Sequence, residues 1–129
     1  MIKIMSFNIR TASARDGRNG WEYRKQLVVE RIRAFSPDLS GVQECRNDAQ
    51  AEFLKSSLPD YFFIGFERGG RDGTAIEMAP IFIKQSSFEI LDAGCFWLSE
   101  TPEMPGSISW GSAFPRTVTW AKLKRLRRR

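Results

Sequence analysis

The sequence of 129 residues contains no histidine. This absence excludes each site that needs an imidazole: a Ser-His-Asp triad, a Cys-His pair, a zinc site with histidine ligands and a histidine general base. The chemistry that remains to the chain is that of carboxylates, amides, hydroxyls and amines.

Cysteine is also scarce, since Cys45 and Cys95 are the only two thiols. Residues of the hydrophobic class make up 42% of the chain, so a core can form without disulfides. We expect reduced cysteines in a cytoplasmic protein, with a pairing between the two left open. No run approaches the roughly 18 apolar residues of a membrane span, and polar residues interrupt the N-terminal segment where a signal peptide would be apolar. We therefore expect no membrane partner.

The net charge of +5 comes from one end of the chain. Six of the 20 Lys and Arg residues lie in the last eight residues, 122–129, which leaves 14 cations against 15 anions elsewhere. We expect a basic tail over residues 124–129 that is either solvated or in contact with nucleic acid. The slightly acidic body favours the solvated tail.

The pattern of apolar residues predicts alternating strands and helices. A spacing of 3.6 residues predicts a helix over 21–35, and a second helix is expected over 47–58, with Asn47 and Gln50 as a capping box. Strands are expected over residues 2–8, 39–44, 61–66, 79–83, 88–91 and 117–123, with a compact apolar segment at 95–98. Residues 11–20, 68–73 and 99–115 are typical of loops. This order predicts an α/β fold.

Two polar residues end the first two predicted strands. The crossover through the first helix makes these strands parallel, so Asn8 and Glu44 lie side by side at their carboxyl ends. An amide and a carboxylate offer the oxygen ligands that suit Mg²⁺, which would polarise a phosphoryl oxygen. Both residues also have ordinary structural roles, in a turn and beside a helix N-terminus. The pattern alone leaves both interpretations open.

Several segments, taken in order, resemble the endonuclease/exonuclease/phosphatase superfamily, which has the DNase I-like fold. They are Met5-Ser6-Phe7-Asn8-Ile9-Arg10, Trp21 and Arg24, Ser36-Pro37-Asp38-Leu39, Gly41-Val42-Gln43-Glu44, Pro80-Ile81-Phe82, Phe96-Trp97-Leu98-Ser99-Glu100-Thr101-Pro102 and Arg116-Thr117-Val118-Thr119-Trp120. The later segments are similar to bacterial members whose substrate is not generally established. The spacing between the Asn8 and Glu44 motifs carries most of the specificity.

The resemblance implies a centre that binds a divalent metal and a phosphate. Glu44 would be a direct ligand to Mg²⁺ or Mn²⁺, and Asn8 would be a catalytic neighbour that acts at the site through a hydrogen bond or through water. Arg116 would be either a catalytic phosphate contact or part of a surface ion pair. Glu77 and Trp110 would bind substrate.

Two departures from the family pattern lie beside Glu77 and Trp110. Relatives carry a Gly before Glu77 that this chain lacks, and Gly111 stands where an Asp is expected after Trp110. Trp97, Trp110 and Trp120 are open to two interpretations, stacking on a base or sugar and packing in the core.

The resemblance covers residues 2–123, about the first half of the superfamily domain. The second half would supply an Asn-Thr-His strand, a Gly-Asp-Phe-Asn motif and a terminal Ser-Asp-His, and none of these occurs in the sequence. We therefore expect a partial domain over residues 1–123. Its fold would be the N-terminal half of a DNase I-like α/β sandwich, with one mixed sheet and two helices on its outer face.

The expected function is divalent-metal-dependent hydrolysis of a phosphoester, of the phosphodiesterase, nuclease or phosphatase type. Because half of the site is missing, we expect weak metal binding and little or no activity in the isolated chain. The alternatives are a non-catalytic half-domain and a nucleic-acid-binding module with a basic tail. A sheet face left uncovered predicts self-association or a complementing chain.

Overall fold

A mixed four-stranded sheet forms the centre of the fold. The structure is a computed structural model that describes residues 1–127. The sheet has the order β1 (Ile4–Asn8), β2 (Leu39–Gln43), β6 (Ile81–Lys84) and β4 (Tyr61–Ile64). β1 and β2 are parallel, while β6 is antiparallel to both β2 and β4. The predicted α/β fold with a mixed sheet is confirmed.

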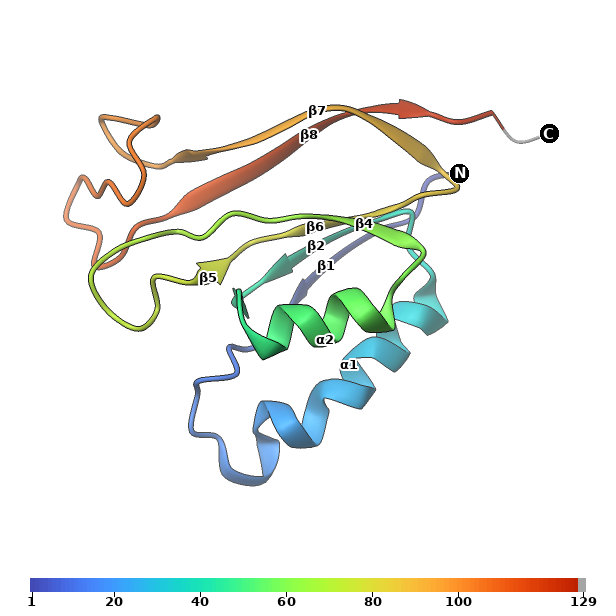
Figure 1. Ribbon diagram of the computed structural model, residues 1–129, viewed down its shortest axis with the longest axis horizontal. Helices are drawn as coiled ribbons and strands as arrows, with labels where there is room; N and C mark the ends of the chain where they lie inside the picture. Colours follow the sequence, from blue (N-terminus) through green and yellow to red (C-terminus); the bar gives the residue numbers. More distant parts are fainter. Residues whose placement is uncertain (128–129) are drawn as a thin grey trace.

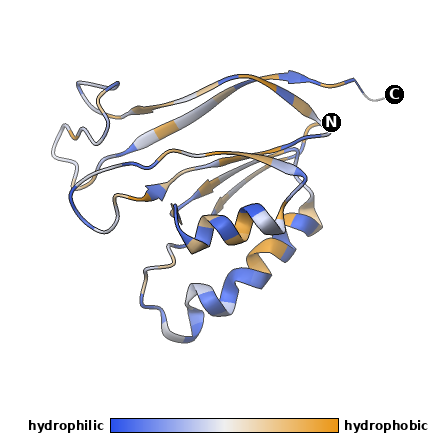
Figure 2. Ribbon diagram, in the orientation of Figure 1, coloured by the Kyte–Doolittle hydropathy of each residue, from blue (hydrophilic) through white to orange (hydrophobic). Residues whose placement is uncertain are grey.

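Two helices cover one face of this sheet (Figure 1). α1 (Trp21–Phe35) has the predicted range, and α2 (Ala49–Ser57) begins two residues later than predicted. Polar and apolar residues alternate along both helices (Figure 2). Val28, Ile32 and Leu54 are buried, because the spacing of 3.6 residues per turn brings such residues onto one side of a helix.

The predicted capping box of α2 is wrong. Asp48 is the N-cap residue, and its Oδ1 accepts a hydrogen bond of 3.1 Å from the backbone N–H of Gln50. Asn47 instead donates from Nδ2 to Oε2 of Glu67 at 2.9 Å. Asn and Asp cap helices about equally well, so the local sequence does not decide whether Asn47 or Asp48 is the N-cap. The hydrogen bond from Asn47 to Glu67, 20 residues away, decides it, because it takes the Asn47 side chain away from the helix end.

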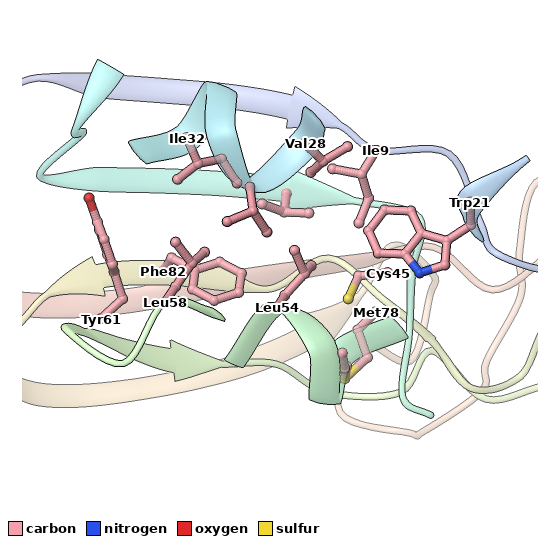
Figure 3. Close-up of a cluster of buried hydrophobic side chains, with 13 residues drawn as sticks. Ile9, Trp21, Val28, Ile32, Cys45, Leu54, Leu58, Tyr61, Met78 and Phe82 are labelled. Carbon is pink, nitrogen blue, oxygen red and sulfur yellow. The ribbon is translucent and has the colours of Figure 1, made fainter. Parts of the chain in front are cut away.

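The core lies between the helices and the sheet (Figure 3). Ile9, Ile32 and Leu54 are fully buried in it, and Phe82 of β6 packs edge-on against Phe63 with a centroid distance of 5.3 Å. Each strand contributes alternate residues to this layer. The residues between them point to the opposite face of the sheet.

A two-stranded antiparallel ribbon lies on the side of the sheet away from the helices (Figure 1). It consists of β7 (Phe88–Trp97) and β8 (Thr117–Arg125). The sequence predicted two separate segments in place of β7 and an earlier end for β8. β7 is continuous because its polar middle pairs with β8, and a register shift between Ile90 and Asp92 accommodates one extra residue.

Basic residues of β8 lie opposite acidic residues of β7. Lys122 is paired with Asp92, and Lys124 with Glu89. Opposite charges in directly facing positions stabilise an antiparallel pair. Part of the basic run therefore belongs to the ribbon. The domain boundary after residue 123 and the nucleic-acid contact stay predictions, and Arg128 and Arg129 lie outside the described residues.

Two short strands and the state of the cysteines complete the description. β3 (Cys45–Arg46) pairs with β5 (Glu77–Met78), and the sequence did not predict this pair.

Both cysteines are free thiols. Within residues 1–127, no helix has the length and apolar character needed to cross a bilayer.

Candidate functional site

The ends of β1 and β2 bring Asn8 and Glu44 into contact. The parallel register places Asn8 opposite Gln43, the residue before Glu44. The amide of Asn8 donates from Nδ2 to Oε2 of Glu44 at 2.6 Å. Asn8 lies on the face of β1 opposite Met5 and Phe7, which are partly buried against the core, since successive residues of a strand alternate. The pair therefore opens toward the ribbon side of the sheet.

The backbone around this pair is strained at two residues. Glu44 has φ of 60° and Arg10 has φ of 62°, both in the left-handed region that residues with a Cβ seldom adopt. Such a conformation costs of the order of 1–3 kcal/mol and is concentrated at functional sites. At Glu44 it separates β2 from β3, so the carboxylate lies at the end of the strand.

The orientation of the Asn8 side chain is fixed at both ends of its amide. Oδ1 accepts a hydrogen bond of 3.0 Å from the backbone N–H of Arg10, while Nδ2 donates to Glu44. The amide oxygen is therefore already used. The second carboxylate oxygen of Glu44, Oε1, has no hydrogen-bond partner in residues 1–127.

A buried glutamine holds the loop that follows β1. Gln50 of α2 is 1% exposed and contacts this loop through both ends of its amide. Its Oε1 accepts from the backbone N–H of Ala12 at 3.0 Å and of Arg46 at 3.1 Å, and its Nε2 donates to the carbonyl of Arg10 at 3.1 Å. The sequence predicted Gln50 as part of a capping box and did not indicate this role. A buried amide joining three backbone groups becomes visible only once the loop and helix are placed together.

Arg24 of α1 supports the same loop from the other side. Its Nη1 donates to the carbonyl of Ile9 at 3.0 Å, and its Nε donates to the carbonyl of Asn19. The residue after Asn8 is therefore held in place from a helix that begins 12 residues further along the chain.

Asn8, Glu44 and Arg116 line one cavity of about 580 Å³. Arg116 is exposed and lies over the ring of Phe114, with 5.6 Å between the guanidinium carbon and the ring centroid. It forms no ion pair with an acid anywhere in the described residues. Its charge is therefore available to an anion in the cavity.

Glu77 lines the same cavity, but its carboxylate is engaged. It is 8% exposed, and its Oε2 lies 3.5 Å from Nη2 of Arg68. Arg68 also donates to the carbonyl and the hydroxyl of Thr74 and lies over the ring of Phe114 at 4.9 Å. The sequence predicts a loop over residues 68–73 and does not single out Arg68 as a site residue. The only feature of the sequence that could have pointed to Arg68 is that this arginine lies in a glycine-rich segment.

The three tryptophans considered from the sequence differ in their surroundings. Trp97 is buried and donates from Nε1 to the carbonyl of Arg68 at 2.7 Å. Trp120 is 38% exposed and lies against Gly94, where a Cβ would come within 2.7 Å of the indole ring. Trp110 is 72% exposed and is not among the residues that line the cavity. The structure thus brings Asn8, Glu44, Glu77 and Arg116 together, but not Trp110.

The described residues at this site offer a metal ion a single free carboxylate, that of Glu44. Across residues 1–127, no group of three His, Cys, Asp or Glu side chains could hold a metal ion together. The free oxygen of Glu44 is nevertheless a suitable ligand for Mg²⁺ or Mn²⁺, since Mg²⁺ is usually held by one or two carboxylates and completes its coordination with water and phosphate. Asn8 fits beside that ligand because it fixes the carboxylate through the other oxygen.

Three ionisable groups near the site have shifted pKa values. Arg10 donates from Nε and Nη2 to both carboxylate oxygens of Asp16, at 3.0 and 3.1 Å. These hydrogen bonds lower the pKa of Asp16 and raise the pKa of Arg10. Burial raises the pKa of Cys45, the residue after Glu44, to about 12. Cys45 is therefore a neutral thiol and does not act as a nucleophile here.

Comparison with solved structures identifies relatives that share the fold of nearly all of this chain. An endonuclease/exonuclease/phosphatase from Bacteroides vulgatus is 38% identical, with a TM-score of 0.86 over 96% of this chain and 47% of that one. A mannosyl-6-phosphatase from Bacteroides thetaiotaomicron is 34% identical, with a TM-score of 0.86 over 97% of this chain and 46% of that one. The prediction of about half of a DNase I-like α/β fold is thereby confirmed.

Sequence comparison gives the same assignment. An uncharacterized protein of Acanthamoeba polyphaga mimivirus is 30% identical over 96 residues, which is 71% of this chain and 35% of the viral protein. The chain thus spans about half the length of its solved relatives and about a third of this viral relative. The family model described as Endonuclease/Exonuclease/phosphatase family matches residues 5–78, more than half of the chain. On these grounds the chain belongs to the endonuclease/exonuclease/phosphatase family.

Proposed function

We propose that Asn8, Glu44 and Arg116 form part of the active site of a divalent-metal-dependent phosphoester hydrolase. The observation that carries this proposal is the shared cavity, in which a carboxylate fixed by Asn8 lies together with an unpaired guanidinium. A metal ligand and a phosphate-binding cation are the two parts that a phosphoester site needs first. The mannosyl-6-phosphatase relative supports phosphoester cleavage at a site of this fold.

Each residue has a separate task in this proposal. Glu44 would hold Mg²⁺ or Mn²⁺ through its free oxygen, and the ion, when bound, would stabilise charge on the phosphoryl oxygens. Asn8 keeps the carboxylate in position, and Arg116 binds a phosphate oxygen. In the overall reaction a water oxygen bonds to phosphorus, the bond from phosphorus to the organic oxygen breaks, and a proton from water ends on the released alcohol.

The residues that line this cavity also predict a weak catalyst. Glu44 is a single free carboxylate, the other acid in the cavity is paired with Arg68, and the sequence has no histidine to activate water. We therefore propose weak metal binding and slow or absent hydrolysis in this chain alone. A non-catalytic half-domain, or one that acts when another chain supplies the remaining groups, is the alternative form of the same proposal.

Paramagnetic broadening by Mn²⁺ tests the metal site without relying on turnover. In the ¹⁵N-labelled chain, the amide signals of Asn8, Glu44 and Cys45 should broaden first. Glu44→Gln should abolish this selective effect. Glu52→Gln, which removes a carboxylate from the exposed surface of α2, should leave it unchanged.

Hydrolysis of a model phosphomonoester and a model phosphodiester with excess Mg²⁺ then measures the activity of the chain. Any activity above background should fall in Glu44→Gln and in Arg116→Gln. Broadening that is equal in Glu44→Gln and the unchanged chain would remove Glu44 from the proposed site.

A further inference from the structure

A second hollow lies beside the cavity that holds Asn8 and Glu44. Its volume is about 500 Å³, and none of the proposed catalytic residues lines it. Phe114 and Pro115 line both hollows and so form the wall between them. A molecule with a phosphate at Arg116 could therefore extend past this wall into the second hollow.

Glycine backbone forms much of the second hollow. Gly69, Gly70 and Gly106 all have positive φ, of 78°, 112° and 77°. A Cβ on Gly69 would lie 3.1 Å from Cα of Gly106, so only glycine permits the two loops to approach this closely. The N–H groups of Gly70 and Gly106 donate no hydrogen bond within residues 1–127.

Two charged side chains add polar groups to this backbone surface. Asp72 accepts from the N–H and the hydroxyl of Thr74 through Oδ1, while Oδ2 has no partner in the described residues. The Thr74 hydrogen bonds lower the pKa of Asp72, so the carboxylate stays ionised at neutral pH. Arg71 is exposed and forms no ion pair in residues 1–127.

The composition of the lining distinguishes between classes of organic group. Phe114 is the one aromatic residue among the described residues that line the second hollow, and two guanidinium groups already lie over its ring. A nucleobase that stacked on the ring of Phe114 would compete with Arg68 and Arg116 for that ring. Hydroxyl groups instead match a carboxylate oxygen, a guanidinium and free backbone N–H groups.

We propose that the second hollow binds the hydroxylated ring of a phosphorylated sugar whose phosphate lies beyond Phe114 and Pro115, next to Arg116. This inference rests on the proposed function because it takes the phosphate to lie in the first cavity. It adds a separate binding site, formed by the loop of Gly69–Asp72 and the loop that contains Gly106 and Ala113.

NMR titration of the full chain with excess Mg²⁺ tests the two sites separately. The ligands are inorganic phosphate, mannose 6-phosphate and adenosine 5′-monophosphate at matched ionic strength. Phosphate should shift the signals of Asn8, Glu44 and Arg116 only. Mannose 6-phosphate should also shift those of Gly70, Asp72 and Gly106, and should bind at least about tenfold more tightly than phosphate, a difference of roughly 1.4 kcal/mol.

A variant that fills the second hollow isolates its contribution. Ala113→Trp places a large ring in the lining and should reduce the affinity for mannose 6-phosphate to that for phosphate, while phosphate binding stays unchanged. Ala34→Trp, on the exposed surface of α1, is the matched control and should bind both ligands like the unchanged chain.

Four results would overturn the inference. Equal affinities for phosphate and mannose 6-phosphate, or tighter binding of the adenosine nucleotide, would remove the sugar site and leave the phosphate site intact. Full sugar-phosphate affinity in Ala113→Trp would do the same. If phosphate fails to shift the signals of Arg116 and Glu44, the proposed function fails, and the sugar site fails with it.

Discussion

Asn8 and Glu44 lie 36 residues apart in the sequence and are joined by a hydrogen bond of 2.6 Å between the amide nitrogen and a carboxylate oxygen. The amide oxygen of Asn8 is held in turn by the N–H of Arg10. Glu44 therefore presents its second oxygen from a carboxylate whose position is fixed. This relationship makes the contribution of Asn8 measurable.

Asn8→Ala should weaken Mn²⁺ binding by about 10- to 100-fold, the usual effect of losing a residue that orients a metal ligand. The same paramagnetic titration measures it. Asn19→Ala is the control, because the contacts of Asn19 are made by its backbone. An unchanged affinity in Asn8→Ala would show that the hydrogen bond to Glu44 has no part in metal binding.

Gln50→Ala should lower the free energy of unfolding by roughly 1–3 kcal/mol, because it leaves buried backbone groups without a partner. The groups affected are the N–H groups of Ala12 and Arg46 and the carbonyl of Arg10. Urea denaturation followed by circular dichroism measures the change. Gln26→Ala on the exposed part of α1 should change stability by much less, and equal effects of the two variants would contradict the role of Gln50.

The carboxyl group of Asp16 should titrate below its ordinary pKa, since Arg10 donates two hydrogen bonds to its charged form. The stabilisation is present above the ordinary carboxyl pKa and is lost as the pH falls through the depressed value of the folded state. A ¹³C NMR titration of the side-chain carboxyl carbon measures this pKa. Arg10→Gln should raise it, and Arg18→Gln should not; a pKa indifferent to Arg10 would refute the assignment.

Cys45 should resist alkylation in the folded protein, because it is fully buried and its pKa is raised to about 12. Iodoacetamide should modify Cys95 slowly and Cys45 only after unfolding, as mass spectrometry can show. Cys95→Ser should make the folded chain inert to the reagent. Rapid modification of Cys45 under native conditions would mean that the segment after Glu44 opens readily.

The isolated chain should self-associate through those parts of the sheet face away from the helices that the ribbon of β7 and β8 leaves exposed. Ile4 is 68% exposed and Phe62 is 39% exposed on this face, since their neighbours along each strand pack into the core. Ile4→Ser combined with Phe62→Ser should shift sedimentation toward monomer. Leu27→Ser, at an exposed position of α1, should not. A monodisperse monomer in the unchanged chain would contradict the prediction.

The spacing of apolar residues and the order of the elements were enough to predict the first helix and the first pair of strands. The range of α1 follows from its apolar spacing, and the parallel pairing of β1 with β2 follows from the crossover. β7 was underestimated because its polar middle, Asp92 to Gly94, is stabilised by pairing with β8 and not by its own composition. β7 and β8 are joined by a long loop, so their pairing leaves no pattern in the local sequence of either strand.

The same distinction applies to the candidate site. Asn8 and Glu44 follow strands that the sequence already indicates, so their proximity could be anticipated. Arg68 could not be found in this way, since its place in the cavity depends on Glu77 and on the ring of Phe114, which lies 46 positions further along the chain. Contacts of this kind are set by the packing of two loops.

The hydrogen bond from the indole of Trp97 to the carbonyl of Arg68 has a practical consequence. Tryptophan emission responds to the polarity and hydrogen bonding around the indole, and this indole is tied to the backbone of a residue that lines the cavity. Trp97 is one of four tryptophans in the chain, and its indole contacts the backbone of a residue that lines the candidate site, so that the part of the emission due to Trp97 can report occupancy in an unlabelled sample.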